Sequence, residues 1–169
     1  MEKIAKQKDK NEKSCIARNE TNTIIEQKNL LKALLIEDNQ LIQQIQSKYL
    51  QALRYTVHIA ATQQQALHYA FSERYDLILA DLGLSDNSNE MMIKNLRRSP
   101  SRNSKTPLIV VTAYTNPSLE SRCFRAGANG FIVKPLTKVQ LEAVIKKLSL
   151  ASPSASNITP YWRQEQESA

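Results

Sequence analysis

Five short, mostly apolar runs, each followed by a helical pattern, constrain the fold of this chain more than any other feature of its sequence. Runs of this length that are apolar on both faces are typical of strands buried in a parallel sheet. Parallel strands need crossover connections, and the helical patterns between the runs can supply them. The sequence therefore predicts an α/β fold, in which helices cover both faces of a five-stranded parallel sheet. The runs are Ala33–Ile36, Thr56–Ala60, Leu77–Ala80, Leu108–Val111 and Phe131–Val133.

The helices between these runs are predicted from polar caps and from apolar residues at helical spacing. Asn39, Thr62 and Thr137 are expected to cap helices, Asn116-Pro117 to start one, and Gly127 to end one. A right-handed, flavodoxin-like order of 2-1-3-4-5 fits this alternation. For the first helix, Gln40–Leu53, the predicted core stripe is Leu41, Ile45, Tyr49 and Ala52, with Ile42 and Leu53 beside it. The other predicted core positions are Ala66, Leu67, Ala70, Phe71, Met92, Ile93, Leu96, Leu119, Cys123, Phe124, Leu141, Val144, Ile145 and Leu148.

The chain is expected to hold one domain between two polar segments. At 169 residues it is long enough for one domain and short for two. Residues 1–29 are rich in Lys, Glu, Asn, Gln and Thr, so we expect a polar N-terminal extension or linker there. The domain is predicted over residues 30–150. We interpret 151–169 as a C-terminal tail, too short for a DNA-binding helix-turn-helix domain.

Composition excludes several classes of protein. There is no apolar stretch long enough to cross a bilayer and no secretory signal, so we expect a cytoplasmic protein without membrane insertion. Cys15 and Cys123 are too few and too far apart to indicate a disulfide framework or a metal site.

The net charge of +7 raises the question of nucleic-acid binding. The basic residues are spread over Lys3–Lys13, Arg97–Lys105 and Lys138–Lys147, with acidic residues interleaved in the first segment. We interpret this pattern as a solvated surface and expect no direct nucleic-acid binding. A basic exterior can still favour acidic partners by electrostatic steering.

Polar side chains follow directly where four of the predicted strands end. Glu37 and Asp38 follow the first run, Asp81 the third, Thr112 the fourth and Lys134 the fifth. In the predicted order these ends lie side by side at the edge where open α/β sheets bind ligands. Three converging carboxylates need a cation, and their oxygens suit Mg²⁺. A carboxylate can attack a phosphoryl group, with a metal, a lysine and a hydroxyl neutralising and positioning it.

Each of these residues also has an ordinary structural explanation. Glu37 and Asp38 could be acids at a helix N-terminus, which the macrodipole favours. Thr112 could simply end a strand, Phe131 could be core, and Lys134 could be a surface amine. All of these ordinary roles together would require several coincidences in register. We therefore favour a functional site.

With these motifs in this order, residues 31–149 resemble the receiver domain of two-component response regulators and hybrid histidine kinases. The resemblance implies a signal transduction domain, not an enzyme, which switches its surface for partner binding when phosphorylated. The donor would be a histidine kinase or a histidine phosphotransfer protein; the downstream target is unknown. The matching motifs are Leu-Ile-Glu37-Asp38-Asn, Asp81, Thr112-Ala113 and Phe131-Ile-Val-Lys134-Pro135.

The resemblance also implies which residues accept the phosphoryl group and hold the metal. Asp81 would be the phosphoacceptor. Asp38 and Asp81 would bind Mg²⁺ together with the backbone carbonyl of Gly83, while Glu37 would contact the metal through water.

Three residues after strands 4 and 5 would act on the phosphoryl group or respond to it. Lys134 would pair with the phosphoryl oxygens, and the Thr112 hydroxyl would swing towards them. Phe131 would be the aromatic switch, whose rotamer follows the threonine. The family usually has a cis peptide before the proline at this point, so one is expected between Lys134 and Pro135.

The loop behind the predicted acceptor departs from the usual family pattern. Ser85 and Asn89 stand where Pro and Gly are usual; Asn tolerates a left-handed turn better than most residues. Gly83 and Tyr114 occupy the two positions that modulate the lifetime of the phosphoryl group in the family. We expect that lifetime to be tuned there, in a direction that the sequence does not give.

Two other functions share features with this pattern. A haloacid-dehalogenase-like phosphatase needs a second Asp two residues after its nucleophile, and Gly83 stands there instead. A phosphate-independent, receiver-like interaction module remains the alternative. Such modules usually lose the acceptor, an acidic residue or the lysine, and this chain retains all of them.

Overall fold

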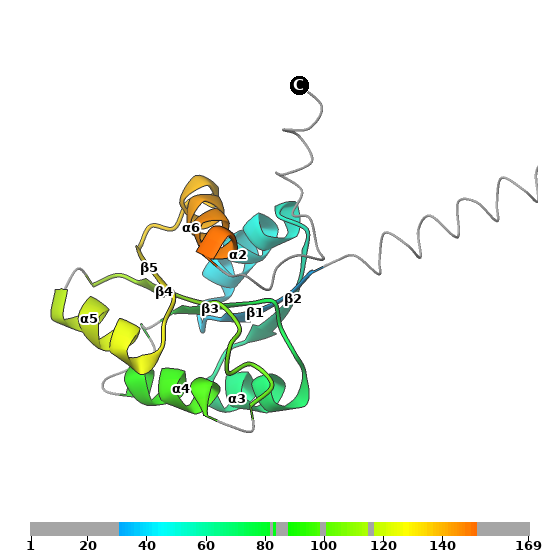
Figure 1. Ribbon diagram of the computed structural model, residues 1–169. Coiled ribbons are helices and arrows are strands. Elements are labelled where there is room, and N and C mark those ends of the chain that lie inside the picture. The colour runs from blue at the N-terminus through cyan, green and yellow to red at the C-terminus, as the bar shows by residue number, and fades with distance from the viewer. Residues whose placement is uncertain (1–30, 82, 84–87, 99–100, 115–116, 152–169) are drawn as a thin grey trace, which may run out of the picture. The chain divides into compact units, whose positions relative to one another are not determined.

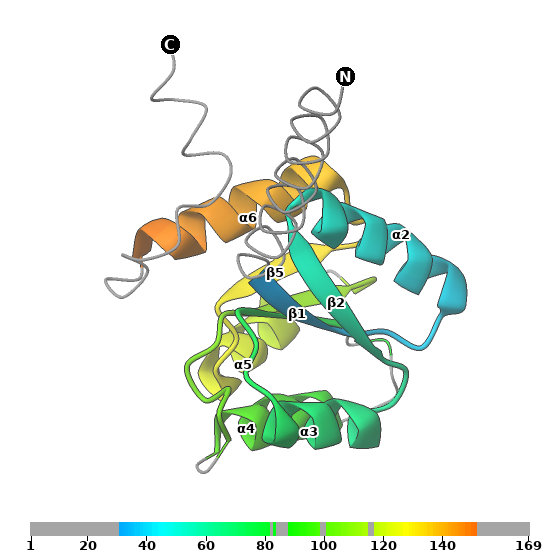
Figure 2. The ribbon, with the colours of Figure 1, turned by 90° about the vertical axis from the view of Figure 1, so that its right-hand side faces the viewer.

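A computed structural model describes residues 31–81, 83, 88–98, 101–114 and 117–151. Five parallel strands pair in the order β2-β1-β3-β4-β5, which confirms the predicted fold. Helices α2 and α6 cover one face of the sheet, and α3, α4 and α5 cover the other (Figures 1 and 2). The elements are β1 (Leu31–Ile36), α2 (Gln40–Ala52), β2 (Tyr55–Ala60), α3 (Gln63–Ser72), β3 (Leu77–Asp81), α4 (Ser88–Arg97), β4 (Leu108–Thr112), α5 (Pro117–Ala126), β5 (Gly130–Val133) and α6 (Lys138–Ala151).

The core lies in two layers, one on each face of the sheet. Every residue of β3 and β4 is buried, because central strands in a parallel sheet are covered on both sides. Burying these apolar side chains against the helices is the main stabilising contribution to the fold. No helix in the described part of the chain is long and apolar enough to cross a membrane.

Local signals determine where the helices begin and end. The Asn39 side chain accepts hydrogen bonds from the backbone N–H groups of Leu41 and Ile42, so it caps α2 as predicted. The Thr62 and Thr137 hydroxyls cap α3 and α6 in the same way. Helix α5 begins at Pro117, and Asn116 lies outside the described residues.

The predicted core stripe of α2 is only partly right: Tyr49 and Leu53 pack against the core, but Leu41, Ile45 and Ala52 are exposed. Leu41 is 66% exposed and Ile45 is 41% exposed. The rotation of α2 is set at its first turns, where Asn39 caps the helix and Gln43 Nε2 donates to the backbone oxygen of Glu37 at 2.7 Å. Residues at three- and four-residue spacing from Gln43 therefore face the sheet. The buried residues of α2 are Gln46, Ser47 and Leu50, and the Ser47 hydroxyl has no hydrogen-bond partner.

Two further predicted core positions are also exposed. Phe71 on α3 is 46% exposed and Phe124 on α5 is 44% exposed. Their neighbours Ala70 and Cys123 are fully buried and occupy the face that packs against the sheet. The small or narrow side chains let these helices approach the strands, and the larger rings point outward.

Asn103, in the connection between α4 and β4, uses its whole hydrogen-bonding capacity inside the protein. It is fully buried. Its Oδ1 accepts from the Tyr75 backbone N–H at 2.8 Å and from Thr106 Oγ1 at 3.1 Å. Its Nδ2 donates to the backbone oxygens of Ala70 and Glu73 at 2.6 and 2.7 Å. These bonds fasten the α4–β4 connection to the α3–β3 connection.

Arg97, at the end of α4, joins the same edge to the α5–β5 turn. Its Nε donates to the Gly127 backbone oxygen at 2.9 Å, and its Nη2 donates to Asn129 Oδ1 at 2.7 Å. Its Nη1 donates to the backbone oxygens of Asn103 and Thr106 at 3.0 and 2.7 Å. Gly127, with a φ of +115°, ends α5 as predicted, and a Cβ there would lie 2.8 Å from Arg97 Cγ.

Candidate functional site

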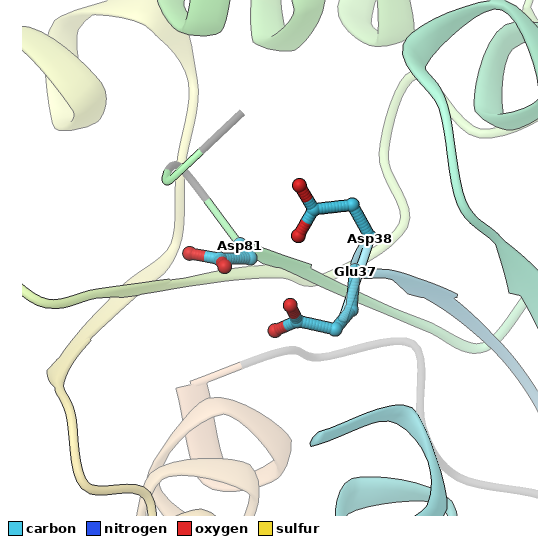
Figure 3. A group of neighbouring side chains, drawn as sticks. All are labelled: Glu37, Asp38 and Asp81. Carbon is cyan, nitrogen blue, oxygen red and sulfur yellow. The ribbon is translucent and has the colours of Figure 1, made fainter. Parts of the chain in front are cut away.

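Three carboxylates gather at the edge where β1 and β3 end (Figure 3). Ile36 pairs with Ala80 in the sheet, so the residues that follow the two strands are neighbours. The candidate ligand atoms of Glu37, Asp38 and Asp81 all lie within 4.8 Å of one another. Glu37 and Asp81 are buried, whereas Asp38 is exposed. The strands therefore concentrate negative charge at one point, with exposed Asp38 on its solvent side.

Lys134, directly after β5, supplies a cation to this group. Its Nζ donates to Asp81 Oδ2 at 2.6 Å and to Glu37 Oε2 at 3.1 Å. Burial disfavours the charged amine, but its hydrogen bonds to Asp81 and Glu37 outweigh that effect and raise the pKa of Lys134 above its ordinary value. The amine is therefore charged at neutral pH. The predicted cis peptide between Lys134 and Pro135 is confirmed.

Glu37 is the most deeply buried acid of the site. Burial raises the pKa of Glu37; hydrogen bonds from the Asn39 backbone N–H and from Lys134 lower it, and the net pKa is above the ordinary value. Nearby Asp81 also raises this pKa, because two like charges disfavour each other. Burial is thus the main reason why the Glu37 carboxyl holds its proton more tightly than usual, and Asp81 adds to it.

Gly83 leaves open space beside the Asp81 carboxylate. The Gly83 backbone N–H donates to Asp81 Oδ1 at 2.8 Å. A Cβ at position 83 would lie 3.1 Å from Asp81 Oδ2 and 3.3 Å from Oδ1, closer than ordinary van der Waals contact. With glycine, the carboxylate has no side chain covering it from this direction.

Thr112 ends β4 next to the acidic group. Asp81 pairs with Val111 in the sheet, so Thr112 lies one residue beyond Asp81 on the neighbouring strand. The Thr112 hydroxyl is buried and accepts from the Tyr114 backbone N–H at 3.2 Å. Phe131, which pairs with Val110, is partly buried against the α3–α5 side of the core, and Tyr114 is 65% exposed.

Of the two residues predicted to shape the loop after Asp81, the structure describes only one. Ser85 lies outside the described residues. Asn89, expected to form a turn, lies instead in the first turn of helix α4. The turn prediction for Asn89 is therefore wrong, because the helix already begins at Ser88.

The donor set of this site fits a hard divalent cation. Three carboxylates and the nearby backbone of Gly83 offer only oxygen, which suits Mg²⁺, and exposed Asp38 leaves room for water on one side. Residues 33–146 match the family described as response regulator receiver domain. The chain belongs to this family. The conclusion agrees with the fold, because the receiver domain has the predicted strand order and its acidic group at the carboxyl edge.

Curated relatives of this receiver domain are longer proteins. Transcriptional regulatory protein SrrA of Staphylococcus aureus is 28% identical over 115 residues, covering 68% of this chain and 46% of SrrA. Peroxide stress-activated histidine kinase mak2 of Schizosaccharomyces pombe is 29% identical over 142 residues, covering 77% of this chain and 6% of the kinase. The receiver domain thus spans less than half the length of these relatives.

Solved structures resemble the receiver domain over most of their own length. Chemotaxis protein CheY4 of Vibrio cholerae has a TM-score of 0.64 and 29% identity, covering 70% of this chain and 98% of CheY4. The receiver domain of sensor histidine kinase PA1611 from Pseudomonas aeruginosa PAO1 has a TM-score of 0.62 and 28% identity, covering 70% of this chain and 96% of that one. The PA1611 structure is described with a magnesium ion coordinated in the active site cleft.

One feature near the site of the receiver domain was not predicted from the sequence. Leu41, Ile45 and Val139 are 66%, 41% and 75% exposed, and they come from the first half of α2 and the first turn of α6. These helices begin just after Asp38 and Lys134. The available signal was that the apolar residues of α2 occupy more of its circumference than one buried face can use.

Proposed function

We propose that this receiver domain accepts a phosphoryl group from a phosphohistidine onto Asp81, with Mg²⁺, and changes its surface for a partner. The supporting observation is the setting of Asp81. Its carboxylate is 5% exposed, ends a buried strand, and lies 2.6 Å from a lysine amine within an acidic group. We further propose that residues 30–150 form the domain, flanked by an extension or linker over 1–29 and a tail over 151–169.

Glu37, Asp38, Asp81 and the backbone carbonyl of Gly83 are the groups that would hold Mg²⁺, with Glu37 acting through water. The magnesium described in the PA1611 receiver supports this assignment. When bound, Mg²⁺ supplies positive charge against the carboxylates and the phosphoryl oxygens. Asp38 is the exposed member of the set, so it lies on the side from which an ion enters.

The transfer step is a displacement at phosphorus. An Asp81 oxygen forms a bond to phosphorus while the bond from phosphorus to the donor's histidine nitrogen breaks, and the electron pair of that bond returns to the imidazole. Both Asp81 oxygens accept hydrogen bonds before the reaction, from Lys134 and from the Gly83 N–H.

Lys134 and Thr112 would stabilise the transferred group. The Lys134 amine is already beside Asp81 and charged, so it can pair with a phosphoryl oxygen with little movement. The Thr112 hydroxyl would leave the Tyr114 N–H and donate to another phosphoryl oxygen. Its movement would free space for Phe131, which is only partly buried, to turn inward and change the nearby surface. Gly83 and Tyr114 would set how long the phosphoryl group survives.

The donor would be a histidine kinase or a histidine phosphotransfer protein. We propose that it contacts the exposed apolar side chains Leu41, Ile45 and Val139, because they flank the site on α2 and α6, which cover the same face of the sheet (Figure 2). Leu41 and Ile45, four residues apart on α2, lie on the same helix face, and apolar patches at a protein surface mark interaction sites. The phosphate-independent module is not favoured, since all acceptor-site residues are present.

Intact mass after incubation with acetyl phosphate and Mg²⁺ tests this function. The wild-type chain should gain the mass of one phosphoryl group, and chelator should prevent the gain. Asp81→Asn should gain none, whereas the matched control Asp76→Asn, at an exposed position away from the site, should behave as wild type. A wild type that gains no phosphate, or an Asp81→Asn variant that gains as much, would overturn the proposal.

A further inference from the structure

Basic side chains collect at the edge of the sheet opposite to the phosphoacceptor, where the strands begin. Five of them, all exposed, form what we call the basic strip: Arg74, Arg98, Arg102, Lys105 and Arg125. Their side chains form no ion pair with any acidic group in the described part of the chain. The strip is therefore a concentration of uncompensated positive charge.

The fold brings together the connections that carry the basic strip, although its residues are far apart in the sequence. They lie in or next to the α3–β3, α4–β4 and α5–β5 connections, at the ends of three neighbouring strands. Asn103 Nδ2 donates to the backbone oxygen of Glu73, directly before Arg74. Arg97 Nε donates to the backbone oxygen of Gly127, two residues after Arg125. These hydrogen bonds hold the three connections together, so the charges lie on a fixed framework.

Neighbouring acidic groups do not neutralise the basic strip. Glu73 Oε2 accepts from Lys32 Nζ at 2.8 Å, and Asp76 Oδ2 accepts from the Lys32 backbone N–H at 2.8 Å. Both carboxylates are thus directed to β1, away from the strip. Complementing helix C-termini is a common role of basic residues; half-buried Arg97 covers carbonyl groups at this edge, and Arg125 lies in the last turn of α5. The other four strip residues lie in the connections, outside the helices.

Two exposed aromatic rings lie close in the chain to the first and last residues of the basic strip. Phe71 is 46% exposed and lies three residues before Arg74; Phe124 is 44% exposed and directly precedes Arg125. Aromatic rings beside a cationic surface are typical of sites for single-stranded nucleic acid, where bases stack on the rings and cations follow the backbone. A purely acidic peptide would use the cations, whereas single-stranded nucleic acid uses both the cations and the rings. Arginine, four of the five strip residues, also matches phosphate geometry.

We propose that the basic strip binds the phosphodiester backbone of single-stranded nucleic acid, with Phe71 and Phe124 stacking on bases. A sequence pI of about 9.5 and cations on one face are the general electrostatic signature of such a protein. The sequence suggested only a solvated surface, because the strip residues come from three separate segments that the fold brings together. The site is independent of phosphorylation at Asp81, which lies at the other edge of the sheet.

Fluorescence anisotropy with a labelled oligothymidine tests this site on the full chain. Arg98→Glu with Arg102→Glu should weaken binding roughly tenfold or more, since two phosphate contacts are lost. Lys48→Glu with Lys138→Glu makes the same change in net charge at exposed positions outside the strip and should have little effect. For five contacts, the slope of log affinity against log salt should be about −3.5, and shallower in the strip variant. Phe71→Ala with Phe124→Ala should weaken binding of the single strand several-fold more than binding of a duplex.

Several outcomes would overturn the proposal. They are no binding at low salt, equal losses in the strip and control variants, or no effect of the phenylalanine substitutions. Polyglutamate that binds as tightly as the oligonucleotide would identify an acidic protein as the partner instead. An unchanged circular dichroism spectrum of the Arg98→Glu, Arg102→Glu variant shows that it is folded, so a loss of binding can be assigned to the strip. If the wild-type chain is not phosphorylated by acetyl phosphate, the measured binding of the oligonucleotide is unaffected, because the two sites lie at opposite edges of the sheet.

Discussion

Lys134→Met is the substitution whose effect the structure defines best. The lysine amine lies 2.6 Å from Asp81 Oδ2 and 3.1 Å from Glu37 Oε2, and both carboxylates are buried. Methionine retains much of the side-chain volume but removes the charge. Without metal, the variant therefore contains two buried acids whose candidate ligand atoms lie within 4.8 Å, with no cation between them.

The cost of this arrangement can be estimated in two ways. At 4.8 Å and an effective dielectric constant of about 20, the repulsion is about 3.5 kcal/mol. Protonating one carboxyl of ordinary pKa 4.5 at pH 7 instead costs about 3.4 kcal/mol. Both routes agree, so we expect the free energy of unfolding to fall by about 3 kcal/mol at pH 7 in chelator.

The loss of stability in Lys134→Met should be larger at pH 7 than at pH 5. The raised pKa of Lys134 means that its contribution is fully present below the ordinary value of 10.5 and is lost only as pH rises through the folded-state pKa. Between pH 5 and 7 the difference therefore comes from the carboxyls, which in the variant bind a proton more tightly when folded. At pH 5 protonation costs only about 0.7 kcal/mol, so the deficit should shrink to below about 1 kcal/mol.

Urea denaturation followed by circular dichroism at pH 7 and pH 5 measures this difference. Mg²⁺ should restore most of the lost stability at pH 7, because it supplies the missing charge. Lys138→Met, an exposed lysine four residues further on, is the control and should change stability by less than about 0.5 kcal/mol. A deficit that is equal at both pH values, or an equal loss in the control, would refute the electrostatic argument.

Three further predictions concern the surface, the acceptor and the core. Leu41→Ser with Ile45→Ser should slow phosphotransfer from a protein donor about tenfold but leave phosphorylation by acetyl phosphate unchanged. Gly83→Val should lengthen the half-life of phosphorylated Asp81 several-fold, measured by intact mass over time, since a side chain 3.1 Å from the carboxylate obstructs water. Asn103→Asp should lower the free energy of unfolding in urea by about 2–4 kcal/mol, because it removes two buried donors.

Matched controls make these results interpretable. Met91→Ser changes an exposed apolar residue on α4, on the other face of the sheet, and should leave phosphotransfer unchanged. Asn129→Asp should be tolerated, because Asn129 Oδ1 only accepts, from Arg97 and from the Leu108 N–H. The argument for the α2 surface is contradicted if the α2 variant loses phosphorylation equally with the protein donor and with acetyl phosphate. The argument for Gly83 fails if the half-life in Gly83→Val is no longer than in wild type. The argument for Asn103 fails if the Asn103→Asp and Asn129→Asp variants are equally stable.

The sequence predicts the sheet and the placement of the acidic site because both depend on strand ends. A buried parallel strand must be apolar throughout, so Asp81 at the end of one is visible in the sequence. Its neighbours follow from the strand order. The roles assigned to Thr112 and Lys134 remain predictions.

The rotation of α2 could not be predicted, because apolar spacing alone offered two possible faces. The hydrogen bond from Gln43 to the Glu37 backbone selects the face that buries Gln46 and exposes Ile45. The hydrogen-bond network around Asn103 could not be predicted from the sequence either. Its partners on α3 and in the α3–β3 connection lie 28 to 33 residues away, and no periodic pattern connects them.

The exposed apolar pair on α2 limits the concentration at which this protein stays free of self-association in a cell. Leu41 and Ile45 are exposed in the folded state, so folding does not hide them. If a phosphodonor covers these two side chains, each molecule of this protein made in excess of the donor leaves its apolar surface exposed to solvent. Self-association of this protein should then depend on the ratio in which it and the phosphodonor are expressed. Co-expression of the donor should raise the soluble yield.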